Sequence, residues 1–360
     1  INCGMSLHIW SMHMRITNQR KATKTKKFHK KVILKWIILL VLLGIALYFY
    51  RNSLQEILQG IQALSARQLL VSCLIATVFF LTEGYIVYYM AHHIEATYSW
   101  TKGIRVAYLC EFYRILTLGS GSGFAAIYYL QKDGVAYAKG TGITMIQFVF
   151  KKIAVMLLGV TGFIYLLEQP LTGEVLGGYR EAMVTGCVIT MLIAVCMTVI
   201  TLSEKVKDWL LAAIDWAQKK YPEYNVQMQK WRENLILLND TGRDLLTHKK
   251  RFLMLLVLNL FKLAVIYTIP AYILYGTGQL TIMQSTMLMA VAYMLAGVIP
   301  APSGIGSLEF VFLLFFNCFA QESNTVPSIL VFRFATWIVP FVIGAIVYTA
   351  DKLVHVRQTK

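Results

Sequence analysis

Ionisable side chains inside or beside long apolar segments are the residues of this chain best placed to do chemistry. A charge near the centre of a membrane helix costs at least about 2.5–3.5 kcal/mol, so each of them is a functional candidate. Five are basic and three acidic, and this surplus of positive charge suits an anionic ligand such as a lipid phosphate. The alternative is that they pair with one another and only fix helix packing. They are Glu83, Glu111, Arg114, Lys151, Lys152, Lys262, Glu309 and Arg333.

Two breaks in the apolar sequence add further candidates. Residues 299–309 read I-P-A-P-S-G-I-G-S-L-E between two apolar runs, and residues 119–123 read G-S-G-S-G inside another. Irregular backbone at membrane depth needs protein or a water-filled cavity around it, and one break in each half is typical of a transporter binding site. Half-helix N-termini at such breaks favour phosphate, with close packing of small residues as the alternative. The lipid-binding candidates added here are Ser120, Ser122, Pro300, Pro302, Ser303, Gly304, Gly306 and Ser307.

The elements that would position these residues are membrane helices. The chain is 57% hydrophobic and only 14% charged, with mean hydropathy +0.59, whereas a soluble domain carries about 25% charged residues. Since about 20 apolar residues cross a bilayer as a helix, we predict an all-α, polytopic integral membrane protein with about eight transmembrane helices. The expected spans are 32–50, 69–91, 141–167, 182–202, 252–276, 280–298, 305–320 and 328–350.

The distribution of charge orients these spans. Residues 1–35 hold nine basic residues and no acidic one, which favours the cytoplasmic side of a membrane over a nucleic-acid-binding tail. The loop 203–251, with ten basic and seven acidic residues, is also predicted to be cytoplasmic, whereas 168–181 lacks a basic excess. Segment 104–130 must then enter and leave on one face, so we predict a re-entrant hairpin of two half-helices. Both termini are expected in the cytoplasm, and the matching breaks suggest an inverted repeat.

This topology divides the chain into a basic cytoplasmic tail, 1–31, a transmembrane domain, 32–350, and a second cytoplasmic tail, 351–360. The loop 203–251 inside the transmembrane domain is too polar to cross the bilayer. Its apolar residues recur at helical spacing, which predicts a pair of amphipathic helices lying at the cytoplasmic interface. The spaced residues are Trp209, Ala213, Trp216, Trp231, Leu235 and Leu238.

The sequence contains no motif of a soluble-type enzyme. The six cysteines form no C-x-x-C pair, the seven histidines are scattered, and there is no Walker loop, H-E-x-x-H or G-x-S-x-G. We therefore expect no catalytic residue of that type, no metal and no cofactor.

Three stretches carry a family resemblance. Residues 112–135 read F-Y-R-I-L-T-L-G-S-G-S-G-F-A-A-I-Y-Y-L-Q-K-D-G-V, residues 299–309 form the second break, and Arg333 is followed by F-A-T-W and Pro340. Together they resemble the signatures of the lysylphosphatidylglycerol synthase transmembrane family, the flippase-like membrane domain of MprF proteins. The chain departs from that pattern at three places. Leu118 stands where the family often has proline, Ala125-Ala126 falls near the Gly-Glu of the family, and Ser303 replaces a glycine.

The resemblance implies a function. In that family the membrane part is implicated in moving aminoacylated phosphatidylglycerol between leaflets, and a separate GNAT-like domain transfers lysine from charged tRNA to the lipid. It implies a translocase of the bacterial cell membrane that handles an aminoacylated or other phospholipid and contributes to resistance against cationic antimicrobial peptides. The chain ends at Lys360, without room for the GNAT-like domain, so we expect no lysyltransferase activity from it alone.

The expected ligand contacts follow from charge. Lys151, Lys152, Arg114 and Arg333 would contact the lipid phosphate, and a glutamate at position 83, 111 or 309 would hold a cationic headgroup or balance charge. Two alternatives stay open: a membrane-embedded transferase or membrane part of a split lysylphosphatidylglycerol synthase, and a scaffold without transport. A homo-oligomer and a separate synthase partner are both compatible with the sequence.

Overall fold

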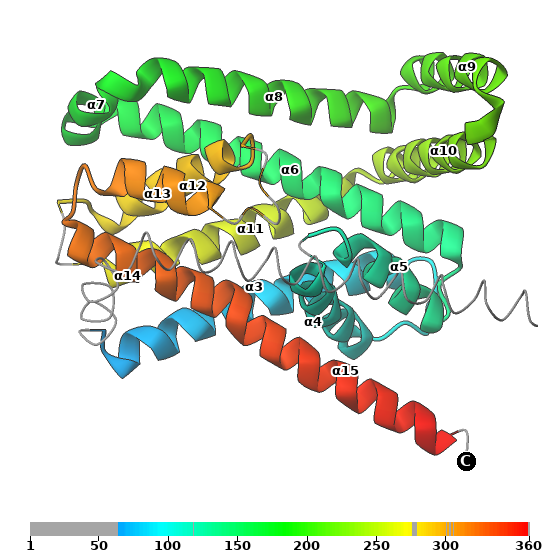
Figure 1. Cartoon of the computed structure of the whole chain (residues 1–360), viewed down its shortest axis with the longest axis horizontal. Helices are drawn as coiled ribbons and strands as arrows, with labels where there is room; N and C mark the ends of the chain where they lie inside the picture. The colour runs from blue at the N-terminus through cyan, green and yellow to red at the C-terminus, as the bar shows by residue number, and fades with distance from the viewer. Residues whose placement is uncertain are drawn as a thin grey trace, which may run out of the picture. The chain divides into compact units, whose positions relative to one another are not determined.

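The computed structural model describes residues 64–358 except 118, 276–278, 300, 302, 303 and 305, and it does not describe the side chains of 202, 241–247 and 354–358. The predicted tail 1–31 and span 32–50 lie outside the described residues, as do Pro300, Pro302 and Ser303. The described part is all-helical, as predicted, and Figure 1 shows the order of its helices. The longer helices are α3 (Ala66–His92), α4 (Trp100–Leu116), α5 (Ser122–Lys132), α6 (Tyr137–Glu168), α8 (Arg180–Leu202), α9 (Glu204–Lys220), α10 (Asn225–Thr247), α11 (Lys249–Ile273), α12 (Ile282–Ala296), α13 (Ser307–Phe316), α14 (Glu322–Arg333) and α15 (Val339–Gln358).

Five helical segments among the described residues are long and apolar enough to cross a membrane. They correspond to the predicted spans 69–91, 141–167, 182–202, 252–276 and 328–350. Two of them are composite: α7 (Pro170–Leu176) and a short 3-10 turn lead into α8, and the π-helical segment η4 (Phe334–Ile338) joins α14 to α15. Outward-facing side chains on these spans are apolar, as at Leu192, which is 59% exposed, so they suit contact with lipid. The spans are Ala66–His92, Tyr137–Glu168, Pro170–Thr201, Lys249–Ile273 and Glu322–Leu353.

The predicted re-entrant hairpin is present, and we call it hairpin 1. Its helices α4 and α5 pack against each other and have 17 and 11 residues. At 1.5 Å per residue they are about 25 and 16 Å long, shorter than the hydrocarbon core of about 30 Å. The turn between them contains Gly119 in the left-handed region, with φ 102°, where a side chain would be strained. Thr117 stabilises the turn, because its Oγ1 accepts a hydrogen bond from the Gly121 N–H at 2.6 Å.

A second re-entrant hairpin, hairpin 2, replaces the two full spans predicted at 280–298 and 305–320. Its helices α12 and α13 have only 15 and 10 residues, about 22 and 15 Å, so neither crosses the core alone. The helices are short because α12 ends at Gly297 and α13 begins only after Gly304 and Gly306, whose φ angles are 72° and 84°. The chain therefore enters and leaves on the same side, as it does in hairpin 1.

Both hairpin tips point toward the middle of α6, from opposite ends. In hairpin 2, Met287 packs on Gly162 and Met294 on Gly159, while Gly297 at the tip lies beside Lys152. In hairpin 1, Gly123 near the tip packs on Thr144, and Leu130 packs on Gly140 nearer the start of α6. An inverted repeat would produce this arrangement.

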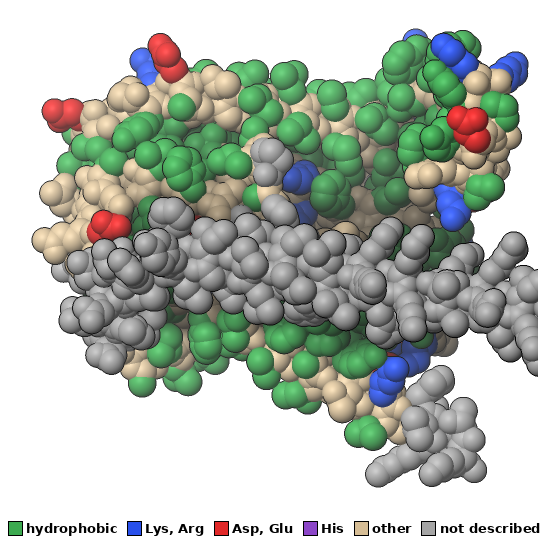
Figure 2. Space-filling view, viewed as in Figure 1, with side chains coloured by type: hydrophobic (Ala, Val, Ile, Leu, Met, Phe, Trp, Pro, Cys, Tyr) green, Lys and Arg blue, Asp and Glu red, His purple; other side chains and the backbone are tan. Residues whose placement is uncertain are grey.

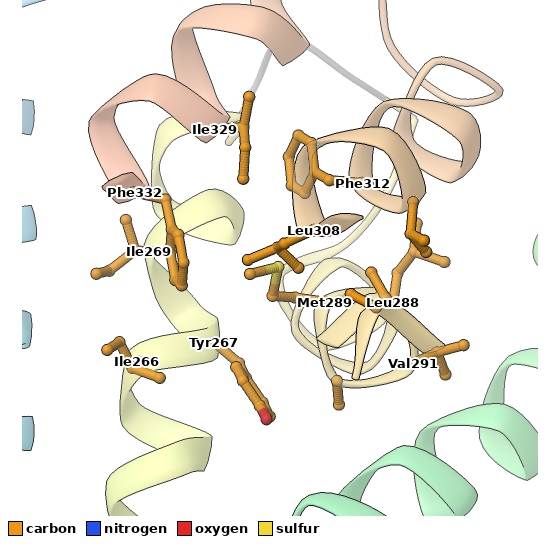
Figure 3. Packing of buried hydrophobic residues seen from close by; sticks show 14 of the residues in the cluster. Ile266, Tyr267, Ile269, Leu288, Met289, Val291, Leu308, Phe312, Ile329 and Phe332 are labelled. Atoms are coloured by element: carbon orange, nitrogen blue, oxygen red, sulfur yellow. The ribbon is translucent and has the colours of Figure 1, made fainter. Parts of the chain in front are cut away.

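Hairpin 2 is embedded in the main hydrophobic core. Leu288 and Met289 of α12 and Phe312 of α13 have no exposed surface. Figure 3 shows Met289 pointing toward Ile269 of α11 and Phe332 of α14, and Phe312 opposite Ile329 of α14. Hairpin 1 packs instead on α3 and α15. Phe112 of α4 stacks on Phe341 and Tyr348, with ring centroids 5.2 and 5.4 Å apart.

The polar segment after α8 folds into the predicted pair of amphipathic helices, α9 and α10, joined by a turn at Pro222–Tyr224. Ser203 caps α9, since its Oγ accepts a hydrogen bond from the Val206 N–H. Asn239 of α10 donates to the carbonyl oxygens of Thr201 and Ser203 at 3.2 and 3.4 Å, which holds the pair against the end of α8. Figure 1 shows the pair at one end of α6 and α8, which lie side by side.

Candidate functional site

A cavity of about 780 Å³ lies where the two hairpin tips meet α6. This is the size of a small-molecule site, and its lining is mostly apolar with a few convergent polar groups. Helices α3, α4, α5, α6 and α12 and the segment around η4 contribute side chains to it. Nine of the predicted site residues line the cavity: Glu83, Glu111, Arg114, Ser122, Lys151, Lys152, Gly304, Ser307 and Arg333.

Four other predicted residues do not line the cavity. Ser120 is exposed, and its hydroxyl donates to the Thr117 carbonyl oxygen at 3.1 Å, so it serves the turn of hairpin 1. Lys262 is fully buried and pairs with Glu83, and Glu309 pairs with Arg333 and accepts the N–H of the exposed Gly306. Their roles are in supporting the wall.

Glu83 of α3 forms an ion pair with Lys262 of α11. Gln147 of α6 donates a hydrogen bond from Nε2 to Glu83 Oε1 at 2.9 Å. Gln147 was not among the predicted site residues, although it lies one helical turn before Lys151 in the same apolar segment. This triad ties three helices together and neutralises the carboxylate that faces the cavity.

Arg114 and Glu111, three residues apart on α4, form the second pair. Arg114 donates from Nε to Glu111 Oε2 at 2.8 Å and from the other end of the guanidinium to Oε1. Two parallel bonds of this kind fix both side chains in one plane. The carboxylate of hairpin 1 is thus satisfied within its own helix.

Arg333 at the end of α14 forms the third pair, with Glu309 of α13. Its Nε donates to Glu309 Oε1 at 2.6 Å and one terminal nitrogen donates to Oε2 at 2.8 Å. The same nitrogen also donates to the Gly304 carbonyl oxygen at 2.7 Å. Glu309 in turn accepts the Gly306 N–H at 2.9 Å. Arg333 therefore holds the irregular tip of hairpin 2 in place and satisfies backbone groups that the break leaves free.

Lys151 and Lys152 have no such partner among the described residues. Neither forms a salt bridge or a hydrogen bond there, both are half-buried, and both line the cavity. The Nζ atom of Lys152 lies 5.7 Å from the ring centroid of Phe148, which is one helical turn earlier on α6. Figure 2 shows Lys or Arg side chains midway along the visible face, next to hydrophobic side chains. After three pairings, two ammonium groups remain for a ligand.

The two half-helix N-termini are alike in their capping. In α13 no side chain caps the first turn, because Glu309 accepts only the N–H of Gly306, the residue before the helix. Helix α5 has no side-chain cap, and its first residues, Ser122 and Gly123, line the cavity. The first N–H groups of a helix have no intrahelical acceptor and carry the positive end of the helix dipole. They can therefore bind an anion on the side of the cavity formed by hairpin 1.

Trp337 links the two arginines of the site. Its ring lies under the guanidinium of Arg114 at 4.9 Å and under that of Arg333 at 4.5 Å, within the range of a cation–π interaction. It belongs to η4, where the wider π-helical turn re-aims side chains. Trp337 was not among the predicted site residues, although it follows the predicted Arg333 by four residues, one helical turn.

The described residues contain no group of three His, Cys, Asp or Glu side chains that could hold a metal ion. The cavity wall carries no such cluster, and its reactive side chains are limited to the ion pairs, the two lysines, serine and threonine hydroxyls, Tyr293 and Cys110. The arrangement is suited to holding an anion.

Comparison with known protein families gives one match. The family described as the lysylphosphatidylglycerol synthase TM region matches residues 32–344, which is most of the chain. No curated protein matches the chain significantly. The match covers both hairpins, all three ion pairs and the two unpaired lysines.

Proposed function

We propose that this chain, which belongs to the lysylphosphatidylglycerol synthase transmembrane family, is a translocase that moves a phospholipid, aminoacylated or not, between the two leaflets of the membrane. Family membership makes it a multi-pass membrane protein related to the synthesis or translocation of lysylphosphatidylglycerol. The observation that carries the proposal is the pair of unpartnered lysines, Lys151 and Lys152, in a cavity between two opposed re-entrant tips.

The physical problem in lipid translocation is the headgroup. A phosphate that enters hydrocarbon loses its hydration, which is prohibitive without compensating charge and hydrogen bonds. In the proposed mechanism Lys151, Lys152 and the α5 N-terminus replace that hydration while the acyl chains stay in lipid. The cavity would be reached alternately from each side as one hairpin moves against the other, as in transporters with inverted repeats.

The distribution of charge supports a membrane orientation with the α9–α10 end in the cytoplasm. That pair carries Lys205, Lys207, Lys219 and Lys220, whereas the opposite end around α7 carries Glu168, Glu174 and Glu181. Asp351 near the end of α15 contacts Lys132 at the end of α5, so the C-terminal helix ends on the side where hairpin 1 opens. We infer that both termini are cytoplasmic, and that the protein resides in a bacterial cell membrane.

We further infer that the α9–α10 pair lies on the membrane surface. Trp209, Trp216 and Trp231 are 69%, 62% and 56% exposed, and Lys220 lies over the ring of Trp216 at 5.0 Å. Exposed tryptophans beside lysines suit the boundary between headgroups and acyl chains. The three rings would be shielded from water there.

The central test is translocation of fluorescent phospholipid in liposomes reconstituted with the whole chain. The variant Lys151→Ala/Lys152→Ala is expected to lose at least about tenfold in rate, since two charge-assisted contacts to phosphate, each worth about 1.5–3 kcal/mol, are removed. The matched control is Lys219→Ala/Lys220→Ala on α9, which removes the same charge away from the cavity and should leave the rate unchanged. Unchanged translocation in the first variant, with the protein monodisperse in detergent, would contradict the proposal.

The same purified chain can be used to distinguish a transferase from a translocase. Formation of lysyl-lipid from phosphatidylglycerol and charged tRNA by the purified chain would favour that activity over translocation. If translocation is observed, deleting the gene should change the surface charge of the cell and its sensitivity to cationic peptides. Zeta potential and survival in a cationic peptide measure these two effects.

A further inference from the structure

The charge balance of the cavity bears on which headgroup it accepts. Three carboxylates lie in or behind its wall, and each one is held by a basic side chain of its own: Glu83 by Lys262, Glu111 by Arg114, and Glu309 by Arg333. Glu83 has a second partner in Gln147, and Glu309 has a second partner in the Gly306 N–H. No carboxylate of the wall, among the described residues, is left to receive a new cation.

The basic side chains show the opposite balance. The same wall has two ammonium groups, Lys151 and Lys152, that no carboxylate of the described residues contacts. A ligand that enters meets two ammonium groups that have no direct salt bridge among the described residues, although Lys151 lies within electrostatic range of Glu83. The surroundings are mostly apolar, so charge–charge interactions there are stronger than in water.

Polar side chains along α6 surround the two ammonium groups. Thr144, Gln147 and Lys151 line the cavity at spacings of three and four residues, so they form one stripe along α6. The Thr144 hydroxyl already donates to the Gly140 carbonyl oxygen and Gln147 donates one N–H to Glu83, so the stripe offers a ligand mainly the Lys151 ammonium group. The uncapped N-terminus of α5 packs beside this stripe, through the contact of Gly123 with Thr144. An anion between α5 and α6 would contact a helix N-terminus on one side and an ammonium group on the other.

We infer that the cavity selects a phosphate-bearing headgroup of net negative charge without a cationic group, and that it disfavours an aminoacylated headgroup. A lysyl ester adds two ammonium groups to phosphatidylglycerol and turns its net charge from −1 to +1. Those groups would face Lys151 and Lys152 without a free carboxylate to receive them. The inference rests on the proposed use of this cavity for a lipid headgroup, and it names the chemical class of that headgroup.

Binding of defined lipids to the full chain in detergent tests this inference. The probes are phosphatidylglycerol, lysylphosphatidylglycerol and glycerol 3-phosphate, with dissociation constants measured by titration or native mass spectrometry. Phosphatidylglycerol is expected to bind at least about tenfold more tightly than its lysyl ester. Equal binding of the two lipids, or tighter binding of the lysyl ester, would overturn the inference.

Variants at the two lysines make the test specific to this site. Lys151→Ala/Lys152→Ala should abolish the preference, and Lys151→Glu/Lys152→Glu should reverse it toward the lysyl ester. The control Lys219→Glu/Lys220→Glu makes the same charge change on α9 and should keep the wild-type preference. If the charge-reversed variant does not fold, the alanine variant alone decides, because a preference unchanged in it assigns selectivity to other residues and sinks the inference.

Two further outcomes separate the ligand source and the proposed function. If glycerol 3-phosphate displaces phosphatidylglycerol and binds with the same affinity, the inferred preference for a negative phosphate group is supported, and the ligand is a soluble phosphate compound. Selective binding of phosphatidylglycerol without translocation would uphold the inferred selectivity and refute the translocase. Equal binding and equal translocation of both lipids would refute the inferred selectivity and uphold the translocase.

Discussion

The two re-entrant hairpins have the same outline, but their tips are held in different ways. Hairpin 2 is fixed by contacts from outside itself, because Arg333 reaches from α14 to Glu309 and to the Gly304 carbonyl oxygen. Hairpin 1 forms its ion pair, Arg114 with Glu111, within one helix. The ion pair of hairpin 2 therefore ties its tip to another helix, whereas the ion pair of hairpin 1 does not.

The surroundings of the hairpins differ in the same sense. Hairpin 2 is packed among fully buried apolar residues such as Leu288 and Phe312. The base of hairpin 1 is held by an ionic network in which Asp351 contacts Arg105 at 3.1 Å and Lys132 at 2.6 Å. Apolar packing is non-directional and involves no charges that salt could screen, whereas partly exposed ionic contacts weaken as salt rises. If one hairpin moves during translocation, hairpin 1 is the better candidate.

The strongest test of this comparison removes the arginine of each hairpin tip. Arg333→Leu should cost about 3 kcal/mol of stability, because Glu309 and the Gly304 carbonyl both lose a partner at membrane depth. Arg114→Leu should cost less, about 2 kcal/mol, because Arg114 holds the buried carboxylate of Glu111 but no backbone carbonyl. Thermal unfolding in detergent measures both. Equal losses would mean that the tips are held alike.

A double variant checks the reason given for this difference. Glu309→Leu/Arg333→Leu removes both charges together, so no isolated carboxylate is left in the wall. It should be more stable than Arg333→Leu alone. A double variant that is less stable would assign the effect to packing.

The next test concerns how closely each hairpin approaches α6. A Cβ atom on Gly162 would lie 2.8 Å from the Met287 carbonyl oxygen, so Gly162→Leu should push α12 away and cost about 2–3 kcal/mol. A Cβ atom on Gly140, in the α5 contact, would lie 3.5 Å from Leu130, so Gly140→Ala should be tolerated. The same unfolding measurement compares them. Strong destabilisation by Gly140→Ala would show that hairpin 1 is held as tightly as hairpin 2.

A smaller effect is expected at the ionic base of hairpin 1. Asp351→Asn weakens two ion pairs and should lower stability by about 1 kcal/mol at low salt, with the loss shrinking at high salt. Asp208→Asn is the control, because its side chain is 70% exposed and lies 3.8 Å from one lysine. Unfolding midpoints at two salt concentrations provide the readout. If the loss of stability in Asp351→Asn does not depend on salt, the ion pairs are not its cause.

The smallest effect is expected at the uncapped helix start. Ser122→Ala should weaken phosphatidylglycerol binding about two- to threefold, the equivalent of one modest hydrogen bond. Ser120→Ala should leave binding unchanged, because that hydroxyl already donates to Thr117 and lies outside the cavity. A lipid titration of both variants separates them. The reverse order would place the ligand on the other side of the turn.

The sequence alone determined the class of the fold and much of the candidate site. Long apolar runs force helices in a membrane, because every backbone polar group must be satisfied within the segment. Glycine-rich breaks and charges inside such runs are costly, so residues such as Glu83 and Lys151 were identifiable without a structure. The amphipathic spacing of Trp209 and Trp216 was likewise sufficient to predict α9.

Only the tertiary structure decided which charges cancel and where helices end. The pairing of Glu83 with Lys262 joins residues 179 positions apart, and no local pattern indicates such a partner. The shortness of α13 depends on left-handed backbone at Gly304 and Gly306, which glycine permits but does not require. Which lysines remain unpaired is therefore a property of helix packing, because an ion pair depends on distance in space and spacing along the chain fixes that distance only within one helix.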